Sequence, residues 1–259
     1  MKSYLVDSHC HLDCLDLGPW NGKIDGALES ARENGVGHML CVAINMENFP
    51  KVLALAEQYE TVTASVGVHP NEREGHDPDV DELMKLAAHP SVVAIGETGL
   101  DYFRSEGDLD WQRERFRRHI AAAKLTNKPL IIHTRESTAD TLKILREERA
   151  EEVGGVMHCF VDDWETAKQA MDMNFYISFS GIVTFKSAVT VKEVAAKVPD
   201  DRLLVETDSP YLAPVPFRGK SNQPAYVRYV AEHIAELRNT DLEVIAEKTT
   251  HNFFTLFKI

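Results

Sequence analysis

Two histidines separated by one residue, His9 and His11, stand at the end of a short apolar run, Tyr4-Leu5-Val6-Asp7. Side chains at positions i and i+2 of an extended strand point to the same side, so this spacing places two imidazoles next to each other. Imidazole nitrogens are good ligands for a divalent metal ion. The pair therefore predicts a metal site, although one such motif is a weak signal on its own.

Further histidine and acidic side chains recur downstream, each directly after a run that is typical of a β-strand. They are Glu97, His133, His158 and Asp208, and His69 follows another such run. Together with the first pair, four imidazoles and two carboxylates exceed the three protein ligands of a typical mononuclear catalytic site. We expect two divalent ions a few ångströms apart with Glu97 as the bridge, an arrangement that activates water for a displacement.

Two acidic residues near the end of this series have different expected roles. Asp208 would bind one ion and accept a proton from the attacking water, so it is the predicted catalytic residue together with Glu97. Glu206 lies two residues earlier and is expected to orient a ligand from behind, although it would share the face of Asp208 in an extended segment. Taken singly, each histidine could equally be an ordinary hydrogen-bonded residue, and only their convergence favours metal binding.

Short β-rich runs alternate with amphipathic helical patterns along the whole chain. The expected strands cover residues 4–7, 37–42, 62–66, 92–95, 130–132, 155–157, 175–178 and 203–206. The expected helices cover residues 23–33, 46–58, 79–88, 108–126, 137–148, 163–173, 188–197, 224–238 and 241–254, with Ser137 as an N-cap and Asn34-Gly35 as a helix stop. This alternation predicts an α/β protein with a TIM-like (β/α)8 barrel, in which functional residues lie at the carboxyl ends of the strands. A doubly wound open sheet is the alternative, but no GxGxxG follows the first strand.

Composition limits the class of protein. The chain has 259 residues, of which 44% are hydrophobic and 27% charged, and it reads as one domain over residues 1–259. The formal net charge of −13 excludes a broad basic surface for sequence-indifferent DNA binding, but not a small phosphate site. The four cysteines match neither a zinc ribbon nor a CxxC motif, and no apolar run approaches the ~20 residues of a membrane helix. We expect a cytoplasmic monomer that does not bind membranes.

A series of motifs, in order across the whole chain, closely resembles the TatD family of metal-dependent deoxyribonucleases in the amidohydrolase-like superfamily. The matching stretches are Val6-Asp7-Ser8-His9-Cys10-His11-Leu12-Asp13, Gly67-Val68-His69-Pro70, Gly96-Glu97-Thr98-Gly99-Leu100-Asp101-Tyr102, Pro129-Leu130-Ile131-Ile132-His133-Thr134-Arg135, Gly155-Val156-Met157-His158-Cys159-Phe160, Glu206-Thr207-Asp208-Ser209-Pro210-Tyr211-Leu212 and Arg218-Gly219-Lys220-Ser221-Asn222-Gln223-Pro224. A departure is Gln223, where the family pattern has Glu. It puts local hydrogen bonding in question rather than the reaction.

The resemblance implies a TIM-like barrel that holds two divalent ions. One ion would be bound by His9, His11, Glu97 and Asp208, and the other by His133, His158 and the shared Glu97. The resemblance also implies hydrolysis of phosphodiester bonds in DNA, commonly as a 3′-to-5′ exonuclease that uses Mg²⁺. We expect single-stranded DNA or 3′ ends as the partner, with RNA as an open alternative. Mn²⁺ would serve the same chemistry, and the histidines are also compatible with Zn²⁺.

Basic residues near these motifs are candidates for gripping phosphate. Arg135 lies two residues past His133, and a Pro/Gly-rich loop after the last strand contains Arg218, Lys220 and Asn222. That region of a barrel often forms phosphate sites. The alternatives are that Arg135 pairs with an acid such as Glu136 or Asp101, and that the loop is a solvated turn.

Three other residues have open assignments. His69 would hydrogen-bond a phosphate or support a ligand, while Tyr102 and Phe103 would either stack on a terminal base or belong to a lid or core. The reaction also has alternatives, because a binuclear barrel can hydrolyse an amide, a lactone or a small phosphoester. The acidic composition keeps these open, whereas a complete ligand set argues against a scaffold without enzymatic activity.

Overall fold

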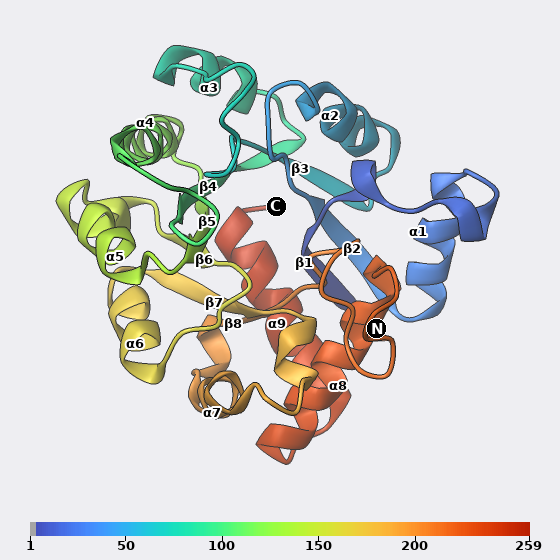
Figure 1. Cartoon of the computed structure of the whole chain (residues 1–259). Helices are drawn as coiled ribbons and strands as arrows, with labels where there is room; N and C mark the ends of the chain where they lie inside the picture. The colour runs from blue at the N-terminus through green and yellow to red at the C-terminus, as the bar shows by residue number, and fades with distance from the viewer. Residues whose placement is uncertain (1–3) are drawn as a thin grey trace.

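The computed structural model describes residues 4–259, in which eight parallel strands form one sheet surrounded by helices (Figure 1). Each strand pairs with its neighbour in sequence, and all of these pairs are parallel. The strands are β1 (Leu5–Cys10), β2 (Val36–Cys41), β3 (Val62–Val66), β4 (Val92–Asp101), β5 (Leu130–Arg135), β6 (Gly155–Met157), β7 (Phe175–Phe179) and β8 (Leu203–Val205).

The first strand meets the segment that follows the last one. The amide of Asp208 donates to the carbonyl of His9 at 2.9 Å, and the amide of His11 donates to the carbonyl of Ser209 at 2.8 Å. Further down, the hydroxyl of Ser8 donates to the carbonyl of Val205 at 2.9 Å. The sheet therefore closes on itself, which confirms the predicted TIM-like barrel and makes the open-sheet alternative wrong.

The first seven helices connect successive strands and, with the eighth, surround the barrel, whereas the last helix lies across the middle of the ring in this view (Figure 1). The helices are α1 (Ile24–Glu33), α2 (Phe49–Gln58), α3 (Val80–Ala87), α4 (Asp110–Thr126), α5 (Thr138–Glu147), α6 (Trp164–Asp172), α7 (Val189–Lys197), α8 (Val227–Arg238) and α9 (Leu242–Phe257). Asn34 and Gly35 do end α1, and Gly35 adopts a φ of +83° there. Ser137 occupies the N-cap position of α5, but its hydroxyl donates to the carbonyl of Leu100 instead of capping the helix.

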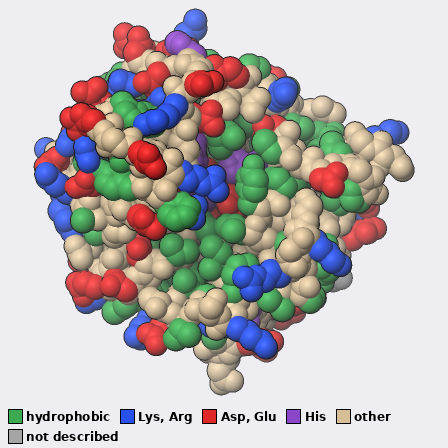
Figure 2. All heavy atoms as spheres, in the orientation of Figure 1, with side chains coloured by type: hydrophobic (Ala, Val, Ile, Leu, Met, Phe, Trp, Pro, Cys, Tyr) green, Lys and Arg blue, Asp and Glu red, His purple; other side chains and the backbone are tan. Residues whose placement is uncertain are grey.

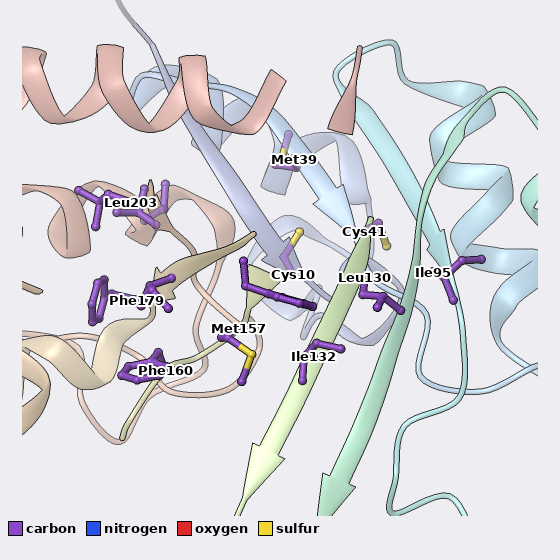
Figure 3. Packing of buried hydrophobic residues seen from close by; sticks show 14 of the residues in the cluster. Cys10, Met39, Cys41, Ile95, Leu130, Ile132, Met157, Phe160, Phe179 and Leu203 are labelled. Atoms are coloured by element: carbon purple, nitrogen blue, oxygen red, sulfur yellow. The ribbon is translucent and has the colours of Figure 1, made fainter. Parts of the chain in front are cut away.

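Two layers of buried apolar side chains hold the barrel together. The outer layer lies between strands and helices and includes Ile95, Leu130 and Ile132, which Figure 3 shows on neighbouring strands. The inner layer contains strand residues of the opposite parity, such as Leu40 and Ile131, and also three residues of α9, Phe253, Leu256 and Phe257. Helix α9 therefore contributes its aromatic side chains to the packing inside the barrel.

Several elements differ in length from the prediction. β4 and β5 continue well past their predicted ends, so Glu97 and His133 lie within strands rather than after them. Similarly, β1 extends through His9 to Cys10. The predicted ends were too early because glycine and polar residues, as in Gly96-Glu97-Thr98-Gly99, are typical of loops. Among residues 4–259, no helix has the length and apolar character needed to cross a bilayer.

Candidate metal centre

Glu97 occupies the middle of a cluster of imidazoles at the carboxyl end of the barrel. Its Oε2 atom lies 3.3 Å from Nε2 of His9. Its Oε1 atom lies 3.0 Å from Nδ1 of His133 and 3.0 Å from Nε2 of His158. The side chain is almost completely buried. Each carboxylate oxygen thus faces a different set of histidines, which is the geometry expected of a bridging ligand.

The first set combines both ends of the chain. Nε2 of His9 and Nε2 of His11 lie 3.3 Å apart, as the i, i+2 spacing predicted. Oδ1 of Asp208 lies 3.6 Å from the first of these nitrogens and 3.3 Å from the second. Three donors from β1 and from the segment after β8 therefore converge on one small volume.

In His11 and His133, the ring nitrogen that points away from the centre lies beside a hydrogen-bond acceptor. Nδ1 of His11 lies 2.9 Å from the carbonyl of Val42, and Nε2 of His133 lies 3.0 Å from Oδ2 of Asp101. An imidazole that donates its proton outward keeps a lone pair on the inner nitrogen. We assign the protons of both rings to these outer nitrogens from the hydrogen-bond network, which leaves the inner nitrogens available to a metal ion.

Glu206 contacts a histidine rather than the centre itself. Its Oε1 atom lies 3.0 Å from Nδ1 of His158 and accepts a 2.8 Å hydrogen bond from the amide of Cys159. Two fully buried atoms close by, Nδ1 of His9 and Oε2 of Glu206, have no hydrogen-bond partner in the described chain. The rings of His9 and His158 stack at 3.9 Å between centroids. The contact with His158 is the arrangement expected of an orienting residue, although Glu206 also forms a possible metal-binding group with His9 and His158.

His69 lies at the same centre, with Nε2 3.4 Å from Oε1 of Glu97. Its Nδ1 accepts a 3.1 Å hydrogen bond from the amide of Asn71. Burial lowers the pKa of His69 to about 3, so the ring is neutral. A neutral ring that accepts through Nδ1 carries its proton on Nε2, which makes His69 a hydrogen-bond donor toward the centre.

The two carboxylates of the centre are ionised. Burial opposes ionisation of Glu97, but the adjacent His158 and other imidazoles outweigh it and lower the pKa well below its usual range. Burial likewise opposes ionisation of Asp208, and the adjacent imidazoles of His11, His158 and His9 lower its pKa overall. Carboxylate oxygens and imidazole nitrogens are a donor set that divalent ions prefer. The residues therefore fit metal ions, and three groups of donors have ligand atoms within 4.8 Å of one another: His9, His158 and Glu206; His9, His11 and Asp208; His69, Glu97 and His133.

A cleft of about 950 Å³ opens above the centre. Figure 2 shows histidine at the bottom of a hollow near the middle of this face, with hydrophobic and basic side chains around it. Four of the five predicted substrate contacts line this cleft, namely His69, Arg135, Arg218 and Lys220.

Asn222 is the exception, because it is 2% exposed and its amide serves the protein itself. Its Nδ2 donates to the carbonyls of Thr207 and Tyr211, and its oxygen accepts from the amide of Gln223. We therefore do not retain Asn222 as a substrate contact, and assign it to holding the loop that follows β8.

The structure also distinguishes between the alternatives that the sequence left open for Tyr102, Phe103 and Arg135. The hydroxyl of Tyr102 donates to Asp140 at 2.6 Å, so this residue belongs to the packing between β4 and α5. Phe103 is 54% exposed. The guanidinium of Arg135 stacks on the ring of Phe103, and among residues 4–259 no carboxylate lies within ion-pair distance of it. The alternative in which Arg135 pairs with Glu136 or Asp101 is thus wrong.

The sequence analysis gave no role in the site to Asp101 or Gly99, which the structure places beside His133. Asp101 contacts His133 and also accepts a 2.8 Å hydrogen bond from the side chain of Asn71. Asp101 is four residues past Glu97 in one extended run, so the i, i+4 periodicity of a strand was a usable signal. Gly99 lies between them at a φ of +136°, and a Cβ there would come within 2.0 Å of the carbonyl of His133. Only glycine lets β4 approach β5 this closely.

Comparison with known proteins agrees with this arrangement. Residues 6–258 match the family model described as TatD related DNase. The chain is 50% identical over 257 residues to the uncharacterized metal-dependent hydrolase YcfH of Escherichia coli K12, covering 99% of this chain and 96% of that protein. It is 44% identical to YabD of Bacillus subtilis, which bears the same description, over 98% of this chain and 99% of that one.

A solved structure extends the similarity to three dimensions. The crystal structure of YjjV, a TatD homologue from Escherichia coli K12, superposes with a TM-score of 0.91 at 31% identity and covers 100% of both chains. The match extends along the chain from the first metal-ligand candidates to the last helix. The chain therefore belongs to the TatD family of metal-dependent hydrolases.

Proposed function

We propose that this protein hydrolyses phosphodiester bonds at the ends of single-stranded DNA, as a 3′-to-5′ exonuclease. The observation that carries the proposal is the combination of a buried carboxylate and histidine centre with basic residues above it. Arg104, Arg135, Arg218 and Lys220 all line the cleft, although the chain as a whole has a formal net charge of −13. These four basic side chains have no ion-pair partner among residues 4–259, although Glu72, Glu97, Asp101 and Asp208 also line the cleft, and they favour an anionic substrate.

The chain supplies distinct groups for each part of such a reaction. Divalent ions held by the centre would supply Lewis acidity that activates water and neutralises charge on the phosphate. Asp208 is ionised and faces the cleft, so it is placed to accept the proton of the attacking water. His69 carries its proton on Nε2 and would donate to a phosphate oxygen, while Arg135, Arg218 and Lys220 would bind phosphates from the rim.

The shape of the cleft favours a strand end over a continuous duplex. Its lining comes from segments after every strand of the barrel, from His11 after β1 to Lys220 after β8. A centre at the bottom of a cleft of this kind is accessible to a terminal nucleotide, which favours a strand end over a continuous duplex. This is the basis on which we propose single-stranded ends, with Mg²⁺ or Mn²⁺ as the activating ions.

The test is digestion of a single-stranded oligodeoxynucleotide that carries a label at the 5′ end. We expect a ladder that shortens from the 3′ end with Mg²⁺ or Mn²⁺, no product with EDTA, and no product from the Asp208→Asn variant. A 3′-phosphorothioate linkage should block the ladder. Intact DNA after incubation with protein that elemental analysis shows to be metal-loaded would refute the nuclease assignment. An RNA oligonucleotide of the same sequence decides the preference between the two nucleic acids.

A second candidate is hydrolysis of another ester, an amide or a small phosphoester by the same centre. The acidic composition favours it, because Asp and Glu outnumber Lys and Arg by 41 to 28 and a long polyanion would meet net negative charge beyond the cleft. A panel of p-nitrophenyl phosphate esters, lactones and N-acyl amides with metal-loaded protein separates the two. A small substrate cleaved while DNA stays intact would establish this second function.

A further inference from the structure

Two arginines at the mouth of the cleft are each stacked on an aromatic ring. The guanidinium carbon of Arg135 lies 3.8 Å from the centroid of Phe103, and that of Arg218 lies 4.5 Å from the centroid of Phe185. Arg135, Arg218 and Phe185 all line the cleft. Neither arginine has a carboxylate within ion-pair distance among residues 4–259, whereas Arg113, Arg117, Arg238 and other arginines outside the cleft are paired.

Stacking prepares a guanidinium to bind an anion. The guanidinium lies over the ring, so the position of the group is restricted before any ligand arrives. Its N–H edges stay free, and they match the oxygens of a phosphate in a bidentate geometry. An arginine that is ordered, uncompensated and turned toward a cleft loses little side-chain entropy on binding. Both pairs thus have the features of preformed phosphate sites.

The two pairs stand at different parts of the rim. Arg135 ends β5, two residues past His133, and Phe103 follows β4. Arg218 lies in the loop after β8 that begins near Asp208, and Phe185 follows β7. One pair therefore lies beside the histidines that face Oε1 of Glu97, and the other lies on the side of the donors that face Oε2. A single phosphate at the centre would have one pair on each side.

We propose that the Arg135–Phe103 and Arg218–Phe185 pairs are two separate phosphate subsites, one on each side of the scissile bond. This inference rests on the proposed phosphodiesterase function and adds a requirement to it. At a 3′ end the outer of the two subsites would be filled only by a terminal 3′-phosphate, so the efficient substrate is a strand end that carries one. Each pair recognises only the phosphate on its own side.

Thymidine dinucleotides test this directly, because their scissile phosphate can be flanked by none, one or two others. The set is TpT, pTpT with a 5′-phosphate, TpTp with a 3′-phosphate and pTpTp. A charge-assisted hydrogen bond contributes about 1.5–3 kcal/mol, so each added phosphate should raise kcat/KM by roughly 10- to 100-fold. We expect Arg135→Gln to abolish the gain from one terminal phosphate and Arg218→Gln to abolish the gain from the other. Arg146→Gln, on the outer helix α5, is the matched control and should keep both gains.

Equilibrium binding of pTpTp in Ca²⁺ supplies a readout that does not depend on turnover. Each cleft variant should weaken binding by about tenfold or more, and the two losses should multiply in the double variant because the subsites are separate. Equal cleavage of all four dinucleotides, or binding that neither variant weakens, would overturn the subsites while leaving the phosphodiesterase intact. Failure to cleave any of them, with binding still weakened by both variants, would instead refute the proposed reaction and retain the subsites.

Discussion

Glu206 is the residue whose replacement tests the construction of the centre most sharply. It is fully buried, and its Oε1 atom bonds both Nδ1 of His158 and the amide of Cys159. In Glu206→Gln the carbonyl oxygen still accepts both hydrogen bonds, so the fold should survive. What disappears is the negative charge behind His158.

The magnitude follows from the two bonds that Glu206 accepts. A hydrogen bond to a charged group contributes about 1.5–3 kcal/mol, and a neutral one about 0.5–1.5 kcal/mol. The ring of His158 therefore loses about 1–1.5 kcal/mol of orienting interaction, which is roughly tenfold in the affinity of the metal site that uses His158. Outer carboxylates behind metal-bound histidines typically contribute 10- to 100-fold, so the expectation lies at the lower end of that range.

Titration of the metal-free protein with Mn²⁺, followed by isothermal calorimetry, measures this loss site by site. We expect one of two binding steps to weaken by about tenfold while the midpoint of thermal unfolding of the metal-free protein stays unchanged. Asp101→Asn should weaken a site through His133 instead, and Glu193→Gln on the surface of α7 should change neither step. Two unaltered binding steps and full activity in Glu206→Gln would show that the charge of Glu206 has no part in orienting His158.

Four further outcomes are expected. Asp208→Asn should lower kcat by roughly 10²- to 10⁴-fold, the usual contribution of a general base, while circular dichroism shows the fold retained. Glu97→Ala should lose at least one metal ion per chain by elemental analysis, and two ions at full occupancy would refute the bridging role. Removal of metal by EDTA should abolish activity and lower the midpoint of thermal unfolding, and both should return with Mn²⁺. Phe253→Ala should destabilise the protein by about 3–5 kcal/mol in urea unfolding, because this ring is completely buried inside the barrel.

The sequence predicted the order of strands and helices because both periodicities are strong in this chain. Apolar β-rich runs identified all eight strands, and the barrel followed from their alternation with helices. The extent of β4 and β5 was not predictable in the same way. Gly96 and Gly99 weaken strand propensity, yet tertiary contacts with β5 keep that segment extended through Asp101.

The candidate metal ligands could be predicted from the sequence, but the hydrogen-bond partners of the residues around them could not. Residue type and position after strands identified His9, Glu97 and Asp208, and the structure brings them together. The hydrogen-bond partners of Asn222 could not be predicted from the sequence. A side-chain amide in a polar loop binds either a substrate or nearby backbone groups, and the conformation of the loop determines which. The tautomer of His69 depends likewise on one backbone amide, that of Asn71.

The closure of the barrel through the amides of Asp208 and His11 has a consequence for biosynthesis. The first set of donors joins residues that lie about two hundred positions apart in the chain, so a ribosome-bound chain has only two of its three members until translation is nearly finished. Ions captured by the isolated N-terminal pair would lack the carboxylate that completes their coordination. Metal binding by the complete first set therefore requires that the segment after β8 has docked on β1, and a chain truncated before β8 lacks Asp208.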